Sequence, residues 1–194
     1  MYREHAGKMP FLITSDGVTF RRMPSTSSAN TTLTTSGPMT SSSTSAPTWA
    51  PSASGPLAVE PILTEVLREN VERNGGGVTV VDGALGTGER ARITWGEKAL
   101  TVPTCTLGEF AGMAGGCDFL KCDCEGAEWF IRPHDLDRVR RIEMEIHMPP
   151  IGGPVNRRLL DYIGAYYDFE IERTPGYDVK GVMGVMHAVR KNGG

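Results

Sequence analysis

A long uncharged segment divides this chain and restricts where a folded core can lie. No charged residue occurs between Arg22 and Glu60, and from Ser25 to Ser54 the sequence consists mostly of Ser, Thr, Ala and Pro. Such a segment cannot bury enough apolar surface to offset the entropy that is lost when it becomes ordered. We therefore expect three parts: a short β segment over residues 1–22, a disordered Ser/Thr/Pro-rich segment over residues 23–55, and a folded domain over residues 56–194.

From Pro56 onward, short strand-like apolar runs alternate with helical patterns. Strands are predicted over residues 57–59, 78–81, 91–95, 117–122 and 141–146, helices over 63–74, 106–112 and 156–166, and an antiparallel pair over 169–173 and 182–189. The alternation predicts an α/β fold with a mainly parallel, Rossmann-like sheet and helices on both faces. Ligands of such sheets bind at the carboxyl ends of the strands.

Two of the predicted helices carry further detail. In residues 63–74, the apolar residues Leu63, Val66, Leu67 and Val71 recur three and four positions apart, which predicts one buried face. The helix over 106–112 begins with a Thr followed three residues later by a Glu, which is the pattern of a capping box.

Charge and cysteine content restrict the function classes. The chain has 20 Lys and Arg against 23 Asp and Glu, so it lacks the basic character of a nucleic-acid-binding protein. It contains no apolar run of about 18 residues, and its N-terminal residues lack the apolar core of a secretory signal, so we expect a cytoplasmic protein without a membrane partner. Three of the four cysteines crowd near one predicted strand, which favours reduced, buried thiols.

The motif with the strongest chemical content covers Lys121 to Glu128 and reads KCDCEGAE. An apolar strand ends there in an acidic turn, which delivers the carboxylates of Asp123 and Glu125 at the carboxyl end of the strand. The segment closely resembles the signature of the FkbM methyltransferase family, apolar-apolar-Lys-x-Asp-x-Glu-Gly-Ala-Glu, and fills each fixed position. That resemblance implies S-adenosylmethionine as cofactor and a class I methyltransferase sheet.

Three more segments resemble this family in the same order, across roughly 135 residues. Glu60 follows a strand and precedes Pro61, and the resemblance implies that its carboxylate binds the ribose of the cofactor. Asp82 and Ala84 lie in a VVDGALG segment that resembles the family's turn beside the adenine. The segment RIEMEIH ends in His147 and resembles the strand that leads to the substrate opening.

The resemblance implies roles for these residues in methyl transfer to a hydroxyl group of a small molecule or sugar. Asp123 would lie near the methyl-bearing end of the cofactor. Asp123 or Glu125 would orient or deprotonate the acceptor hydroxyl, with His147 as a weaker candidate for the base. The predicted cofactor-binding residues are Glu60, Asp82, Ala84 and Asp123, and the predicted catalytic residues are Asp123, Glu125 and His147.

Simpler readings exist for the same residues. Asp123 and Glu125 could cap the helix that follows, and Glu60 could be a surface acid before a helix. A histidine such as His147 is more often a hydrogen-bonded structural residue than a base. The Cys122-x-Cys124 pair lacks a second ligand pair at zinc spacing, so no metal site is predicted. The aromatic residues Trp95, Trp129, Tyr162, Tyr166 and Tyr167 are expected to be packing residues.

The resemblance fails upstream of Glu60, where the family has a first strand and a glycine-rich turn of the form Val-Val-Asp-Val-Gly-Ala-x-x-Gly. Read one nucleotide earlier, with G or C at most third codon positions, Ser42 to Pro51 would encode Val-Val-Asp-Val-Gly-Ala-His-Val-Gly-Ala. Our hypothesis is that about residues 21–54 are an out-of-frame translation of that segment, with a deletion near Ser54. The domain should then lack a regular first strand and first helix.

Two functional hypotheses remain open. The first is an active S-adenosylmethionine-dependent methyltransferase. The second is a catalytically inactive remnant or binding module that keeps the methyltransferase scaffold without the glycine loop. A surface protein with a glycosylated Ser/Thr stalk is a weaker third reading, because the cysteines and the N-terminal residues do not fit it.

Overall fold

The computed structural model describes residues 11–14, 55–95, 98–149, 152–173 and 182–192. The elements lie along the chain as β1 (Phe11–Thr14), β2 (Leu57–Val59), α1 (Thr64–Arg73), β3 (Thr79–Val81), β4 (Ala84–Leu85), β5 (Arg90–Trp95), β6 (Lys98–Cys105), α2 (Leu107–Ala114), β7 (Phe119–Cys122), η1 (Ala127–Phe130), η2 (Pro133–Leu136), β8 (Arg141–His147), α3 (Arg157–Tyr166), β9 (Tyr167–Glu172) and β10 (Val182–Arg190). The protein is therefore a mixed α/β structure, and the predicted elements from residue 57 onward are confirmed.

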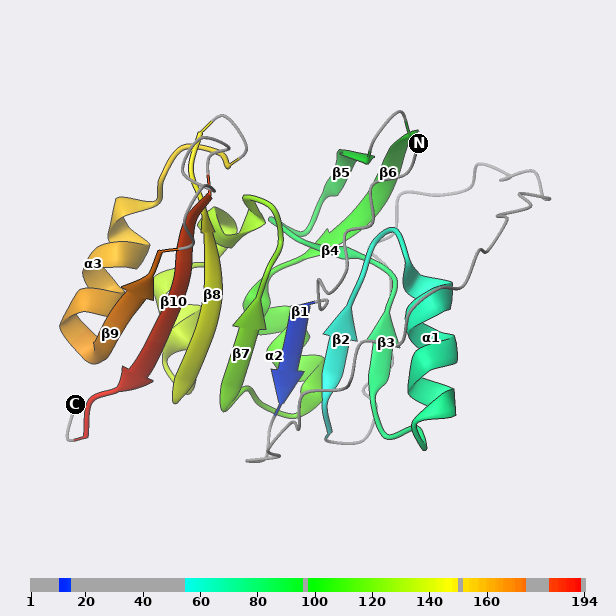
Figure 1. The fold of residues 1–194 in the computed structure, drawn as a ribbon, viewed down its shortest axis with the longest axis horizontal. Coiled ribbons are helices and arrows are strands. Elements are labelled where there is room, and N and C mark those ends of the chain that lie inside the picture. The colour runs from blue at the N-terminus through cyan, green and yellow to red at the C-terminus, as the bar shows by residue number, and fades with distance from the viewer. Residues whose placement is uncertain (1–10, 15–54, 96–97, 150–151, 174–181, 193–194) are drawn as a thin grey trace.

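A seven-stranded sheet in the order β3-β2-β1-β7-β8-β10-β9 forms the centre of the molecule. Strands β2, β3, β7, β8 and β9 run in one direction, while β1 and β10 run in the other (Figure 1). In this sheet only the β2–β3 and β7–β8 pairs are parallel, and the other four pairs of neighbouring strands are antiparallel. The expectation of a mainly parallel sheet is therefore wrong. The predicted antiparallel pair near the C-terminus is confirmed as β9 and β10.

The central position of the sheet belongs to β1, which comes from the N-terminal segment. It lies antiparallel to both neighbours, with Phe11 opposite Val59 of β2 and Leu12 opposite Lys121 of β7. Sequence analysis did not foresee this pairing, because β1 joins partners that are far from it in the chain. The Ser/Thr/Pro-rich residues 23–54 and the proposed out-of-frame segment lie outside the described residues.

The hydrophobic core lies on one face of the sheet. Alternate residues of β7 and β8, such as Leu120, Ile142 and Met144, are buried with side chains of α2, η1, η2 and α3. Helix α2 begins with the predicted capping box: Thr106 Oγ1 accepts the Glu109 N–H at 3.2 Å, and the Glu109 carboxylate accepts the Thr106 N–H at 2.7 Å. These contacts fix the helix that covers the centre of the sheet.

The opposite face of the same strands is polar. Strand β8 reads RIEMEIH, and its Arg, Glu and Glu are exposed or half-buried while the intervening apolar residues are buried. This period of two is typical of a strand with one face in the core and one toward solvent. Helices on both faces were predicted, but over β7, β8 and β10 the described residues provide helical cover on the core face only.

Helix α1 lies beside β3 at one end of the sheet, and its predicted apolar face is covered only in part: Leu67 and Val71 are half-buried (Figure 1). Its apolar residues Leu63 and Val66 are 46% and 41% exposed, and the only buried residue of the helix is Thr64. The helix itself is confirmed. Its periodicity does not show whether another element of the fold covers its apolar face.

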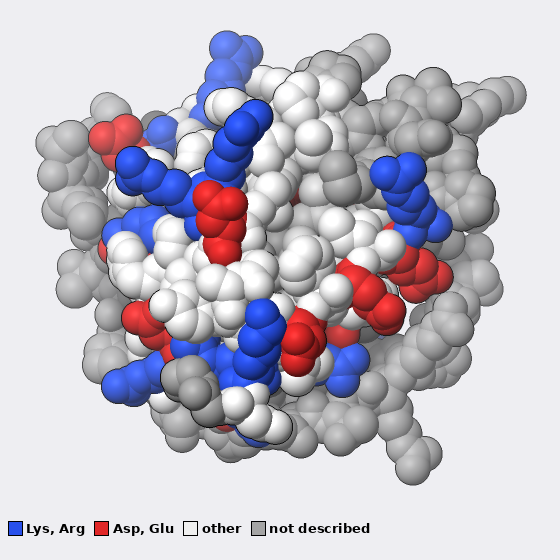
Figure 2. Space-filling model, turned by 90° about the vertical axis from the view of Figure 1, so that its left-hand side faces the viewer, with Lys and Arg blue, Asp and Glu red and all other residues white. Residues whose placement is uncertain are grey.

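A second, three-stranded sheet has the order β4-β6-β5 and stands beside the main sheet. Sequence analysis predicted β5 but missed β4 and β6. On the side of the molecule formed by α3 and β9, Lys and Arg are interspersed with Asp and Glu (Figure 2). Among the described helices, none is long and apolar enough to cross a membrane.

Candidate functional site

The predicted site residues gather along one edge of the main sheet. Glu60 follows β2, Asp82 follows β3, Asp123 follows β7, and His147 is the last residue of β8. Since these four strands run in the same direction, all four side chains start from the same edge. The structure divides them into two groups, one on each side of β1.

The first group is built around Thr64 at the start of α1. Glu60 Oε1 accepts the N–H groups of Ile62 and Leu63 at 2.7 and 2.9 Å. Thr64 Oγ1 donates to the Glu60 carbonyl oxygen at 2.5 Å and lies 3.4 Å from Asp82 Oδ1. Glu60 therefore closes the turn that precedes α1, which agrees with the simpler reading of this residue as an acid before a helix.

The resemblance implied that Ala84 lies in a turn, but the structure places it in strand β4. It pairs with Thr104 of β6 and is half-buried. Two residues later, a Cβ at Gly86 would lie 2.7 Å from Cβ of Thr104, so glycine lets the two strands approach. Strand β4 also contacts η1, which brings the Ala84 segment next to the turn that carries Asp123.

The second group consists of Asp123, Glu125 and His147. One ligand atom from each residue lies within 4.8 Å of the other two. Asp123 Oδ1 and His147 Nε2 are both buried without a hydrogen-bond partner. His147 Nε2 lies 3.3 Å from Glu125 Oε2, although the two atoms lack hydrogen-bond geometry. Glu125 is the only non-glycine residue of the described ranges with a positive φ, at 53°, a conformation that costs about 1–2 kcal/mol.

His147 is held by the residues that follow Glu125. Glu128, itself fully buried, accepts the His147 backbone N–H at 2.7 Å and faces Nδ1 of its ring at 3.1 Å, both through Oε1. The indole N–H of Trp129 donates to the His147 carbonyl oxygen at 2.7 Å. No role was predicted for Glu128, and Trp129 was expected to be a packing residue. The Glu128–His147 and Trp129–His147 contacts have no signal in the sequence, because they join residues 19 and 18 positions apart.

The electrostatics of this group favour positive charge. Burial of the His147 ring disfavours its charged form and acts to lower its pKa, but the Glu125 and Glu128 carboxylates outweigh that effect and raise the pKa to about 10. At neutral pH the ring therefore carries a proton, which makes it a poor general base.

The cysteines beside this group are thiols, as predicted. Cys105, Cys117 and Cys122 are buried and Cys124 is half-buried. The Sγ atoms of Cys122 and Cys124 lie 3.2 Å apart, and Cys124 Sγ donates to Glu128 Oε2 at 3.5 Å. The hydrogen bond with Cys122 and burial raise the pKa of Cys124 well above the usual range, which keeps the thiol protonated.

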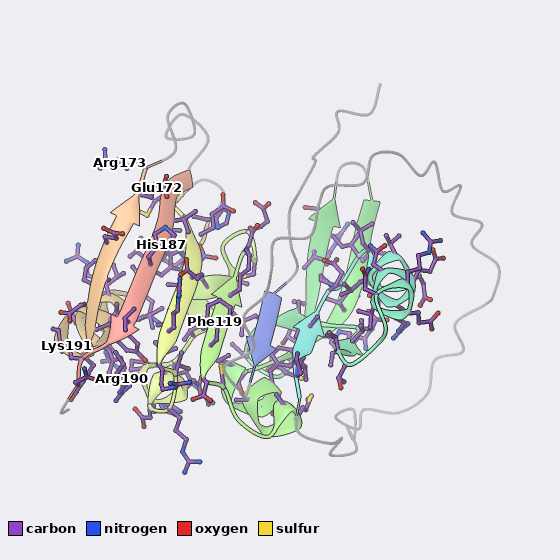
Figure 3. The ribbon with its side chains drawn as sticks, turned by 60° about the horizontal axis from the view of Figure 1, so that its bottom comes forward. Phe119, Glu172, Arg173, His187, Arg190 and Lys191 are labelled. Carbon is purple, nitrogen blue, oxygen red and sulfur yellow. The ribbon has the colours of Figure 1, made fainter. Side chains whose placement is uncertain are left out.

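A separate groove lies on the polar face of the sheet, over β8, β9 and β10. Its volume is about 580 Å³, and its lining includes Arg141, Glu143, Phe169 and His187. His187 faces Glu143 through Nδ1 and lies 3.5 Å from Glu172 through Nε2. Figure 3 shows His187 and Glu172 together toward one end of β9 and β10. None of the predicted site residues lines this groove.

Strands β2, β3, β7 and β8 thus present carboxylates and one histidine at a common edge, in two groups that flank β1. Such an edge can hold polar or cationic ligands. Comparisons with models of protein families, with curated proteins and with solved structures find no match for this chain.

Proposed function

We propose that this chain is an S-adenosylmethionine-dependent methyltransferase of the FkbM type, acting on a hydroxyl group of a small molecule or sugar. The observation that carries the proposal is the common edge: Glu60, Asp82 and Asp123 each come directly after a strand, and the three strands run in the same direction. Ligand sites of doubly wound folds lie at such an edge.

The strand order gives further support. The first five positions, β3-β2-β1-β7-β8, correspond to the order 3-2-1-4-5 of the doubly wound nucleotide-binding fold, where ligands bind near the point at which the order reverses. That point lies between β1 and β7, and it separates the Glu60 group from the Asp123 group. The likeness to this topology stays a proposal, because β1 runs opposite to the direction that such a fold requires.

Part of the edge fits the proposed cofactor. The carboxylate of Glu60 binds the turn before α1 through Oε1 alone, and Oε2 has no partner among the described residues, so it can accept a ribose hydroxyl. Asp82 is exposed beside it. When bound, the cofactor would supply a methyl group on a positively charged sulfur. Glu125, with 39% of its side chain exposed, would orient the acceptor hydroxyl, whereas the protonated His147 would hold Glu125 in position.

The residues described at this edge do not form a binding site for the methionine end of the cofactor. In doubly wound folds, a glycine-rich turn follows the central strand and brings backbone N–H groups to the ligand. Here β1 is antiparallel to β2 and β7. Its first residue, Phe11, therefore lies beside Val59 at that edge, and its last residue, Thr14, lies toward the opposite edge. We therefore derive no transfer step.

This mismatch favours a second candidate function, a catalytically inactive remnant that keeps the scaffold. The DNA that encodes Arg21 to Glu60 distinguishes the origins of the two. If another reading frame encodes Val-Val-Asp-Val-Gly-Ala, the parent protein was a methyltransferase whose cofactor turn this chain has lost. If no frame encodes it, the Ser/Thr/Pro-rich segment is an authentic part of the protein.

Calorimetric titration with S-adenosylmethionine and S-adenosylhomocysteine tests the proposal directly. A methyltransferase should bind both ligands with one site, and Glu60→Ala should weaken binding at least tenfold, because it removes a charge-assisted hydrogen bond to the ribose. Glu69→Ala is a matched control, since Glu69 is an exposed acid on α1 whose ion pair among the described residues is with Arg73. Absence of binding by the unmodified chain would leave the inactive remnant as the function.

A further inference from the structure

We propose that Asp123, Glu125 and His147 bind one divalent transition-metal ion, of the class of Mn²⁺ or Zn²⁺. The proposal rests on the geometry of these three side chains and holds whether or not the chain binds S-adenosylmethionine. It assigns a metal to a group for which the sequence predicted none, because two ligands lie in the turn after β7 and the third at the end of β8, without a recognisable spacing.

The separations of the ligand atoms suit a metal ion. Ligands at about 2.1 Å from a common ion lie about 3.0–3.4 Å from one another in octahedral or tetrahedral sites. His147 Nε2 and Glu125 Oε2 lie 3.3 Å apart without forming a hydrogen bond, and an Asp123 oxygen lies within 4.8 Å of both. A rotation of the Asp123 side chain that shortens its two separations would bring all three atoms to one ion.

Two of the three residues have buried ligand atoms without partners. His147 is 0% exposed, and its Nε2 has no hydrogen-bond partner. The Oδ1 atom of Asp123 is likewise buried without a hydrogen-bond partner. A buried polar atom without a partner costs roughly 1–3 kcal/mol, so native structures rarely keep one that serves no ligand. Both atoms belong to the same small group, and one ion would satisfy both.

The surroundings of His147 are those of a metal ligand. A ligating histidine usually donates its second ring N–H to a carboxylate, which fixes the orientation and tautomer of the ring. Glu128 Oε1 lies 3.1 Å from Nδ1 and accepts the backbone N–H of the same residue. Binding of the ion would displace the second ring proton, and with the remaining proton on Nδ1 the lone pair of Nε2 would point toward Asp123 and Glu125. Glu128 is thus a positioning residue for the proposed ligand.

The ligand set selects the class of ion. Three carboxylates, of Asp123, Glu125 and Glu128, surround one imidazole, so even a protonated ring leaves excess negative charge in this group. One imidazole nitrogen with two carboxylate oxygens suits Mn²⁺, Fe²⁺ or Zn²⁺, and lacks the all-oxygen character that Mg²⁺ and Ca²⁺ prefer. Three protein ligands leave coordination positions open for water or for an oxygen of a bound molecule.

Titration of the full chain with Mn²⁺, followed by the electron paramagnetic resonance signal of the free ion, tests the site. Mn²⁺ is the suitable probe because it binds oxygen and imidazole ligands in preference to the nearby thiols of Cys122 and Cys124. We expect one bound ion per chain. Asp123→Asn and Glu125→Gln should each weaken binding at least tenfold, and Glu128→Gln by about 10- to 100-fold, because a neutral amide is a weaker acceptor for the Nδ1–H and makes Nε2 less basic.

Glu172→Gln provides a matched control, because Glu172 faces His187 Nε2 at 3.5 Å much as Glu125 faces His147, but lies 78% exposed on the polar face. This variant should bind Mn²⁺ like the unmodified chain. Far-UV circular dichroism identifies variants that fail to fold, and Glu125→Gln, at an exposed position, should fold. The proposal is overturned if the unmodified chain binds no Mn²⁺ at millimolar concentration, or if folded Glu125→Gln binds it with unchanged affinity. Either result would leave Glu125 as an ion-pair partner of His147.

Discussion

Replacement of Glu128 by Ala should destabilise this protein more than any change at an exposed acid. The Glu128 carboxylate is fully buried and accepts the N–H of Gly126 at 2.8 Å and the N–H of His147 at 2.7 Å, and it faces the His147 ring at 3.1 Å. Alanine would leave these buried donors without partners. Each such donor costs about 1–3 kcal/mol, so we expect a loss of about 4 kcal/mol in the free energy of unfolding.

Glu128→Gln separates the acceptor function of this side chain from its charge. The amide oxygen can still accept from His147, but the amide nitrogen then meets the Gly126 N–H, which is a contact between two donors. The expected loss is about 1–3 kcal/mol, clearly smaller than that of the alanine variant. Glu69→Ala should change nothing measurable, because Glu69 is exposed and its ion pair, with Arg73, lies at the surface.

Urea unfolding followed by far-UV circular dichroism measures these differences, since fluorescence would also report the local change at Trp129. The m-value should stay constant if the folded state is unchanged. A loss below about 1 kcal/mol for Glu128→Ala would refute the reasoning, because it would mean that water or another side chain satisfies the donors.

Three further results follow from the structure. Thr106→Ala should cost about 1 kcal/mol in urea unfolding by removing the N-cap of α2, and Thr106→Ser should restore most of it; equal stability of all three proteins would contradict the capping box. Burial raises the pKa of Tyr167 to about 12, above its ordinary value near 10, so the neutral phenol stabilises the fold below about pH 10, and this stabilisation is lost as the pH rises through 12. The advantage of the unmodified chain over Tyr167→Phe, measured by urea unfolding, should therefore shrink between pH 9 and 12, and a constant difference would argue against it. Burial likewise raises the pKa of Cys117 to about 12, so iodoacetamide at pH 8 should modify it only after unfolding, and mass-spectrometric detection of modified Cys117 in the folded protein would exclude this environment.

Local sequence patterns were sufficient to predict most elements of this fold. The capping box of Thr106 and Glu109 acts within one turn of helix, and its structure matches the pattern. The strand ends that carry Glu60, Asp82 and Asp123 were also found, because each follows an apolar run. These features depend on residues that are close in the chain, where propensity and periodicity are informative.

The features that the sequence could not supply depend on distant partners. The direction of β1 is set by pairing with residues 57–59 and 119–121 and leaves no trace in its four residues. The exposed face of α1 reads like a buried one, since periodicity does not tell whether a neighbour exists. The Glu128–His147 contact joins two motifs that had been read separately. In strand β8, by contrast, the alternation of polar and apolar residues did signal one solvent-facing side, and the prediction of helices on both faces overlooked it.

Among the described strands, β1 alone links the β2–β3 pair by hydrogen bonds to the other four strands of the main sheet. Its four residues close two long loops in the chain, one to β2 and one to β7. If β1 detaches, β2 and β7 each become an unpaired edge, and such edges pair readily with strands of other molecules. The cohesion of the sheet and its resistance to self-association therefore both depend on Phe11 to Thr14.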